Sequence, residues 1–128
     1  MRLFEKVKAL LLLPTSRRHL CQIMQQLEHH SYDELINHNC GAKNSPVEIN
    51  TVVKAYFWAS RTIKKCHCLP RSIALYQKLN SLGYAVEHKF GVNTQDQSLA
   101  AHAWVEYQNK PLNESPDLKL KFKVLEKI

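Results

Sequence analysis

The chain has 128 residues, of which 45% are hydrophobic and 23% are charged. This length indicates one domain large enough to bury a core, and the composition is ordinary for a globular protein. The formal net charge of +7 favours acidic partners. The basic residues are scattered and no nucleic-acid motif is present, so we expect no nucleic-acid partner.

The apolar run Ala9-Leu10-Leu11-Leu12-Leu13 is too short to span a membrane. It is also short for a signal-peptide core, and no small-residue cleavage site follows Pro14. We therefore expect a cytoplasmic protein without a membrane span, whose four cysteines are reduced thiols.

The N-terminal part predicts helices. Apolar residues at helical spacing indicate a first helix that begins near Leu3 and is ended by Pro14. Those from Leu20 to Leu27 indicate a second helix capped by Thr15 or Ser16. Residues 31–44 are polar without a sustained period, and predict a loop with at most one helical turn.

A third helix is predicted from the sequence Ser45-Pro46-Val47-Glu48, which reads as a capping box with proline at the first helical position. Its apolar stripe comprises Ile49, Val52, Val53, Tyr56, Phe57 and Ile63.

A fourth helix is predicted to begin next to Cys68, because Pro70 suits a first helical turn and Gly83 suits the residue just past a helix end. Apolar residues then recur at helical spacing at Leu69, Ile73, Tyr76, Leu79 and Leu82.

After Gly83 the hydrophobic period changes to two. Strands are predicted over residues 84–92 and 99–107, and a turn at residues 108–110 leads into a third strand. Residues 118–124 form a further strand with a lysine face, which suits a sheet edge. We thus expect one α+β domain over residues 1–128. A helical part (1–66) precedes a helix and an antiparallel sheet packed against it (67–128).

Cys68 and His102 are the candidates for nucleophilic chemistry. A thiol at a helix start feels the positive end of the helix dipole, which favours the thiolate, and a nearby imidazole serves as base and then as acid. A carboxylate, Glu114, follows. This chain order is that of papain-like and transglutaminase-like enzymes. Cysteine is also a common inert core residue, which is the plain alternative for Cys68.

Together, the segments Cys-Leu-Pro-Arg-Ser-Ile-Ala-Leu, Leu-Gly-Tyr, Ala-His-Ala-Trp-Val-Glu and Pro-Leu-Asn-Glu, between Cys68 and Glu114, resemble the lasso-peptide leader peptidases. These are small cysteine-protease subunits within the transglutaminase-like superfamily. The resemblance implies removal of the leader from a ribosomally made precursor peptide, without a cofactor or a metal. The implied partners are the precursor's leader, a separate leader-binding subunit and an ATP-dependent macrocyclase.

The resemblance matches Cys68 to the nucleophile and His102 to the base. Family members often have Asp where this chain has Glu114, so we assign the third role to Glu114, with Asn113 as the alternative. Because strand side chains alternate, only one of these two neighbours is expected to face His102 in a regular strand.

The same alternation puts His102, Trp104 and Glu106 on one face of their strand. If this face turns toward the Cys68 helix, an ion pair between Arg71 and Glu106 is expected to brace the site. The alternative is that both are surface charges. Trp104 is expected to be a core residue.

Three other functions stay open. A metal site would draw on Cys66, His67, Cys68, His88 and His102, although this spacing is poor for zinc. His29, His30, His38 and Cys40 are expected to be ordinary loop residues. A non-catalytic module that binds leader or partner has the same sequence pattern. An acyltransferase would use the same Cys-His-acid site with an amine in place of water.

Overall fold

Helices precede strands along the chain, as the hydrophobic periods predict. The computed structural model describes residues 3–36, 47–92, 101–113 and 122–125. The elements within these residues are α1 (Leu3–Leu11), α2 (Leu13–Gln26), α3 (Tyr32–Ile36), α4 (Ile49–Arg61), α5 (Cys68–Ser81), β1 (Val86–Val92), β2 (Ala101–Tyr107), β3 (Lys110–Pro111) and β4 (Lys123–Leu125).

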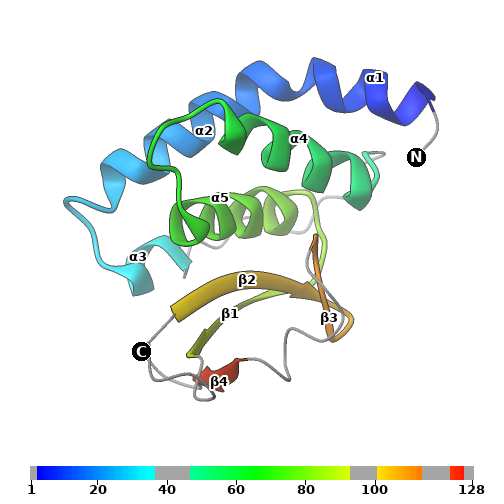
Figure 1. Cartoon of the computed structure of the whole chain (residues 1–128). Coiled ribbons are helices and arrows are strands. Elements are labelled where there is room, and N and C mark those ends of the chain that lie inside the picture. Colours follow the sequence, from blue (N-terminus) through cyan, green and yellow to red (C-terminus); the bar gives the residue numbers. More distant parts are fainter. Residues whose placement is uncertain (1–2, 37–46, 93–100, 114–121, 126–128) are drawn as a thin grey trace.

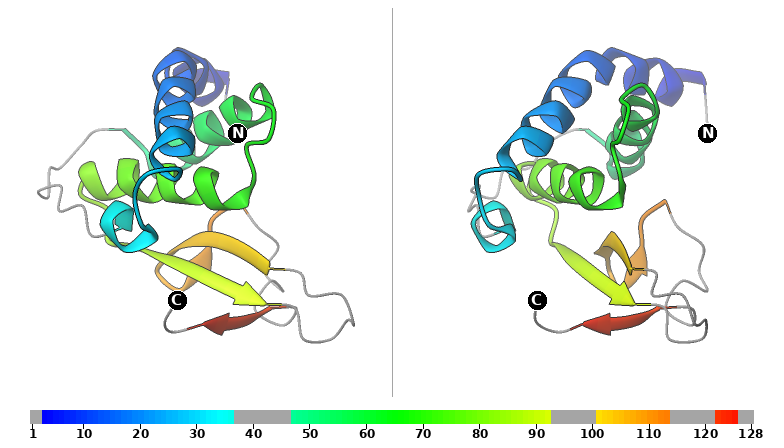
Figure 2. Two further views of the ribbon diagram at one scale, coloured as in Figure 1. Left: turned by 90° about the vertical axis from the view of Figure 1, so that its left-hand side faces the viewer. Right: turned by 60° about the vertical axis from the view of Figure 1, so that its left-hand side comes forward.

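Helix α5 is the middle layer of the molecule. It lies between the helices α1, α2 and α4 on one side and the sheet on the other (Figures 1 and 2). Its side chains Ile73, Ala74 and Leu79 are fully buried, because they meet apolar side chains of both neighbouring layers. The predicted α+β fold, with the sheet packed on the helix that starts at Cys68, is confirmed.

The sheet has the strand order β3-β2-β1-β4 with antiparallel neighbours. Strands β2 and β3 join through Gln108 and Asn109, whose φ angles of 52° and 64° are left-handed. Such a pair makes the tight turn that matches strand twist. The predicted turn at 108–110 is therefore one residue shorter, because Lys110 already pairs with Tyr107. Strand β4 lies at a sheet edge, as expected; Lys119 and Lys121 lie outside the described residues.

The boundary between the first two helices differs from the prediction. Helix α1 ends at Leu11, and Pro14 lies in the first turn of α2 instead of ending α1. Proline is tolerated there because the N–H that it lacks would have no partner within the helix. Ser16 is buried inside α2, and Thr15 donates its hydroxyl to the Leu12 carbonyl at 3.0 Å. Neither residue caps the helix, so that prediction was wrong.

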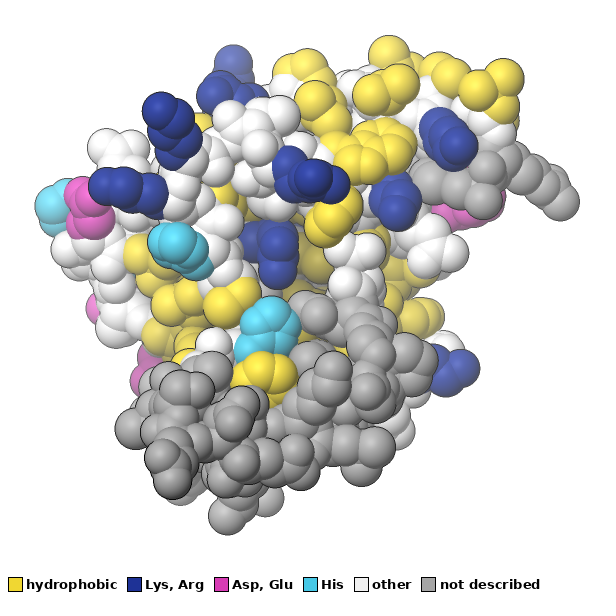
Figure 3. Space-filling view, in the orientation of Figure 1, with side chains coloured by type: hydrophobic (Ala, Val, Ile, Leu, Met, Phe, Trp, Pro, Cys, Tyr) yellow, Lys and Arg dark blue, Asp and Glu magenta, His cyan; other side chains and the backbone are white. Residues whose placement is uncertain are grey.

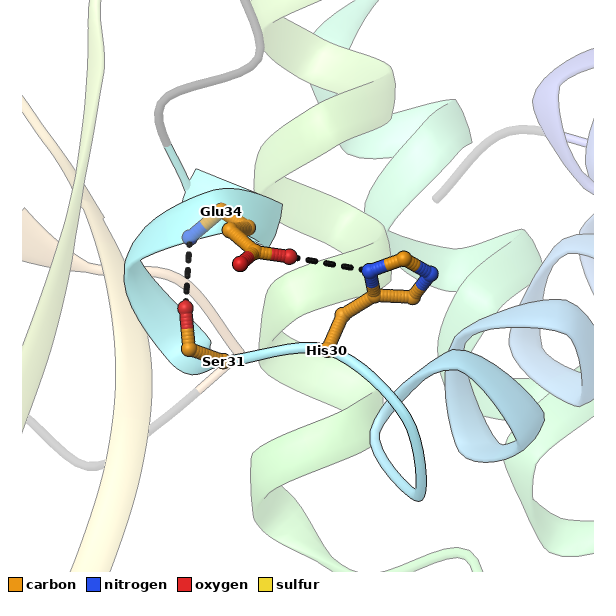
Figure 4. A network of polar contacts seen from close by, with 3 residues as sticks. All are labelled: His30, Ser31 and Glu34. Carbon is orange, nitrogen blue, oxygen red and sulfur yellow. Dashed lines mark hydrogen bonds and ion pairs between the residues drawn. The ribbon is translucent and has the colours of Figure 1, made fainter.

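Helix α3 is short, in line with the prediction of at most one turn for this region. The Ser31 hydroxyl accepts the backbone N–H of Glu34 at 3.3 Å, which caps the first turn (Figure 4). The Glu34 carboxylate lies 2.9 Å from Nδ1 of His30, and both side chains are exposed. His30 is thus a loop residue, as expected. The remainder of the predicted loop, with His38 and Cys40, lies outside the described residues.

Helix α4 begins later than the capping-box pattern predicts. Glu48 is the N-cap residue with extended backbone and no side-chain cap bond, so the helix starts at Ile49 and not at Pro46. The apolar stripe is confirmed in Val52, Val53 and Tyr56, which are buried. Burial of this stripe against α2 and α5 holds the helix without a cap.

Candidate active site

Cys68 is the first residue of α5. His67 precedes it with extended backbone (φ −82°, ψ −177°), and the Arg71 N–H closes the first turn onto the His67 carbonyl at 3.3 Å. The thiol is free and partly buried. The helix start therefore offers Cys68 unpaired backbone N–H groups and a positive partial charge, as the sequence predicts.

Helix α5 and strand β2 begin at the same side of the molecule (Figure 1). The chain leaves α5 through Tyr84, whose ring meets that of Tyr107, the last residue of β2, at 5.8 Å. The 14 residues of α5 rise about 21 Å and the seven of β2 about 24 Å. Because the lengths match, Cys68 lies toward the end of β2 that carries His102.

The ring of His102 lies on the face of β2 that carries Trp104. The two rings stack at 5.9 Å and 21°, and Phe122 meets His102 at 5.4 Å. The residues of the opposite face, Ala103 and Val105, are the ones buried against α5. The ring contacts of His102 thus include Trp104 and Phe122.

Gly91 makes room for this aromatic group. It pairs with His102 across the sheet, and a Cβ at this position would lie 2.7 Å from Cβ of Phe122 and 2.9 Å from the Trp104 ring. The sequence analysis did not identify Gly91 or Phe122 as neighbours of His102. The available signal was a glycine inside a strand pattern, which often marks a close approach.

Glu106 and Trp104 share a face with His102, as the strand period predicts. Trp104 is 2% exposed, which confirms it as a core residue, and its indole N–H donates to the Glu106 carboxylate at 2.8 Å. Glu106 itself is buried. Arg71 lines the cavity between α5 and β2, whereas the Glu106 carboxylate accepts the indole N–H on the other side of β2. The structure therefore does not confirm the predicted brace between Arg71 and Glu106.

Asn113 lies just beyond the end of β3, and Glu114 lies outside the described residues. The Leu112 N–H donates to the Val105 carbonyl at 2.9 Å, so the chain still runs beside β2 toward His102. Asn113 has a left-handed φ of 57° and is exposed. The alternation argument for residues 113 and 114 therefore fails, because a left-handed residue interrupts the strand.

A small cavity of about 30 Å³ lies between α4, α5 and β2. It has room for about two water molecules or a group of that size. Its wall includes Arg71 and Ser72, one turn beyond Cys68 on α5, Ala103 and Trp104, which follow His102, and Asn113, which precedes Glu114, whereas Cys68 and His102 themselves are not part of it. The fold thus brings the flanks of these three positions to one place.

Cys66 differs from Cys68 in its surroundings. Burial raises the pKa of the Cys66 thiol, which Arg71 partly offsets and Cys21 reinforces. Cys66 packs against the core, whereas Cys21 is exposed on α2. A buried thiol with a raised pKa is a poor nucleophile, so Cys66 has the character of a structural residue.

His88 is a candidate ligand of the alternative metal site, but both of its ring nitrogens already have hydrogen-bond partners. Nδ1 lies 2.6 Å from the Tyr32 hydroxyl, and Nε2 lies 2.7 Å from Ser72 Oγ, which also donates to the Leu69 carbonyl at 3.0 Å. Burial lowers the pKa of His88 to about 4. Among the described residues, no three His, Cys, Asp or Glu side chains gather closely enough to hold a metal ion.

In the described part of the chain, no helix is both long enough and apolar enough to cross a bilayer.

Comparison with known proteins places this arrangement in a family. The profile of the Transglutaminase-like superfamily matches residues 9–127 and so includes all three candidate positions. The search of curated proteins and the search of solved structures each returned no match.

Proposed function

Because the chain belongs to the transglutaminase-like superfamily, we propose that it is a cysteine peptidase that removes the leader from a ribosomally made precursor peptide. The family supports cysteine-based acyl chemistry in general, and the resemblance to lasso-peptide leader peptidases supports the particular substrate. One observation carries the assignment of the site: α5 and β2 begin at the same side of the molecule, so Cys68 lies toward the end of β2 that carries His102.

In this proposal the Cys68 thiolate attacks the carbonyl carbon of the scissile peptide bond. Backbone N–H groups at the start of α5 stabilise the oxyanion. The His102 imidazolium protonates the leaving amine, the C–N bond breaks, and a thioester remains on Cys68. Water, activated by His102, then releases the new carboxylate and the free thiol. Glu114 orients the imidazole. The reaction requires the His102 ring to reach Cys68 from its stack on Trp104.

A leader-binding partner supplies substrate recognition in trans, and a macrocyclase acts on the released core peptide. Both belong to the proposal, as does a cytoplasmic location.

The test is to incubate the chain with the precursor peptide and leader-binding protein encoded beside it, and to weigh the products. Hydrolysis gives two fragments whose masses sum to that of the precursor plus one water. Acyl transfer gives instead a product joined to an added amine, which would assign the acyltransferase alternative. Binding of the precursor without any covalent change would assign the non-catalytic alternative. The Cys68→Ala variant is the control for the first two outcomes.

A further inference from the structure

Helix α1 turns its large apolar side chains outward. Its one fully buried residue is Ala9, at 0% exposure. The exposed fractions of its large apolar residues are 77% for Leu3, 69% for Phe4, 45% for Val7, 56% for Leu10 and 74% for Leu11. An ordinary surface helix has the reverse arrangement. The outer face of α1 therefore calls for an explanation beyond the packing of this chain.

These five residues form one ridge. At about 100° per residue they fall within an arc of roughly 120° on the helix surface. Lys6 and Lys8 lie just beyond the two edges of the arc, and Nζ of Lys8 is 4.5 Å from the centre of the Phe4 ring. Glu5, the acidic residue of this helix, is partly buried on the opposite side beside Lys54 of α4.

The surrounding surface is basic. Helices α1, α2 and α4 contain one acidic residue, Glu5, and six basic residues: Lys6, Lys8, Arg17, Arg18, Lys54 and Arg61. Figure 3 shows hydrophobic side chains along α1 at the top of the view and Lys and Arg side chains over the face below them. A binding partner that complements this surface therefore has an apolar centre surrounded by negative charge.

We infer that the outer face of α1 docks this protein on the surface of an anionic lipid bilayer. The apolar ridge enters the boundary between headgroups and acyl chains, and Lys6 and Lys8 extend to the headgroups. The other basic residues of this half of the molecule add attraction to anionic lipid. A bilayer accepts a protruding ridge without a matching groove. A second copy of the chain fits worse, because its lysines would meet these lysines.

The test uses sedimentation of the full chain with vesicles of phosphatidylcholine alone or of an equimolar mixture with phosphatidylglycerol. We expect the chain to sediment with the mixed vesicles and to stay in solution with the neutral ones. Phe4→Ser/Leu11→Ser should bind at least about tenfold more weakly, because both residues are lost from the inserted ridge. Lys6→Gln/Lys8→Gln should bind roughly 30-fold more weakly at low salt.

The matched control is Lys89→Gln/Lys110→Gln, which removes the same charge from the sheet, across α5 from the other helices, and should change binding far less. Circular dichroism melts establish that each variant is folded. If the folded wild-type chain does not sediment with anionic vesicles, the inference is wrong. So does unchanged binding by Phe4→Ser/Leu11→Ser. If α1 variants instead lose a complex with an acidic partner protein while vesicles stay unbound, the ridge is a protein-docking site and the membrane inference is wrong.

Discussion

Cys66 and Cys68 are two residues apart, yet they occupy different environments. Cys66 packs against the core, where burial raises its pKa, and Cys68 opens α5. A helix start offers backbone N–H groups that have no partner within the helix and can stabilise an oxyanion. The thiol chemistry of this chain is therefore expected at Cys68 and not at its neighbours.

Replacing the nucleophile tests this directly. Cys68→Ala should abolish cleavage of the precursor while the protein stays folded, because among the described cysteines Cys68 alone lies at a helix start. Cys21→Ala, Cys40→Ala and Cys66→Ala should each keep most of the activity. The measurement is the rate of product formation by mass spectrometry, with a thermal melt of each variant. Full activity of Cys68→Ala would refute the peptidase.

A second prediction concerns the residue that orients His102. Glu114→Ala should lower kcat by orders of magnitude, since loss of the orienting carboxylate costs about 10⁴ in serine proteases. Asn113→Ala should cost much less, because Asn113 is exposed and left-handed. Comparing kcat for the two variants decides between the residues. A larger loss with Asn113→Ala would transfer the role to the amide.

Two neutral histidines join the elements of this fold. His88 on β1 links Tyr32 of α3 to Ser72 of α5. His19 on α2 lies 2.6 Å from the Tyr56 hydroxyl of α4 and 2.9 Å from Gln77 of α5. Burial lowers the pKa of both rings. Each ring accepts one hydrogen bond from a tyrosine hydroxyl and donates another, so protonation would require that hydroxyl to turn and accept instead.

This arrangement predicts a pH dependence of stability. The pKa of His88 is about 4 in the folded state, and about 6.5 in the unfolded chain. Between these values the unfolded chain binds a proton that the folded chain does not, so stability falls as the pH drops from about 6.5 to 4. Thermal melts across this range should show the loss. His88→Gln should flatten the slope, whereas His67→Gln, at an exposed position, should leave it unchanged.

An identical slope in the His88→Gln variant and the wild type would contradict this role of His88. The absolute melting temperature of the variant does not enter the comparison, because the substitution also changes packing.

The contact between β1 and the aromatic group around His102 gives another prediction. Gly91→Ala should lower the free energy of unfolding by about 1–3 kcal/mol, the usual cost of overpacking. The added Cβ would meet Cβ of Phe122 and the Trp104 ring, which are not flexible chain ends. Denaturant titration measures the loss, and tryptophan fluorescence reports a shifted Trp104. Gly83→Ala is the control. Gly83 has a φ of 96°, so this substitution costs stability through backbone strain, and the fluorescence of Trp104 should not change.

At the scale of the molecule, the layers predict an order of local stability. Helix α5 is covered on both sides, while α1 packs on α4 and exposes its apolar ridge. Amide hydrogen exchange should therefore be slowest in α5 and fast in α1. Mass spectrometry of peptic fragments after exchange measures this order. Slower exchange in α1 than in α5 would contradict the layered arrangement.

The type and order of the elements could be predicted from the amino-acid sequence. Periods of 3.6 and 2 identified the helices and strands, and the helix that starts at Cys68 was predicted nearly to the residue because Pro70 and Gly83 mark its ends. Two helix starts were misplaced, one of them by a capping-box pattern that lies ahead of the helix. At Leu13 and Ile49, packing of apolar side chains decides where the helix begins, and no capping side chain is present to reveal it.

Which faces of the elements meet depends on packing between distant parts of the chain. Alternation groups His102 with Trp104 and Glu106, but it does not say which face of β2 turns toward α5. That choice follows from pairing with β1, where His88 opposite Val105 bonds to Ser72. The sequence likewise did not predict the cavity wall, the close contact at Gly91 or the outward ridge of α1. Each depends on contacts between residues far apart in the chain, and local sequence patterns carry no information about such distances.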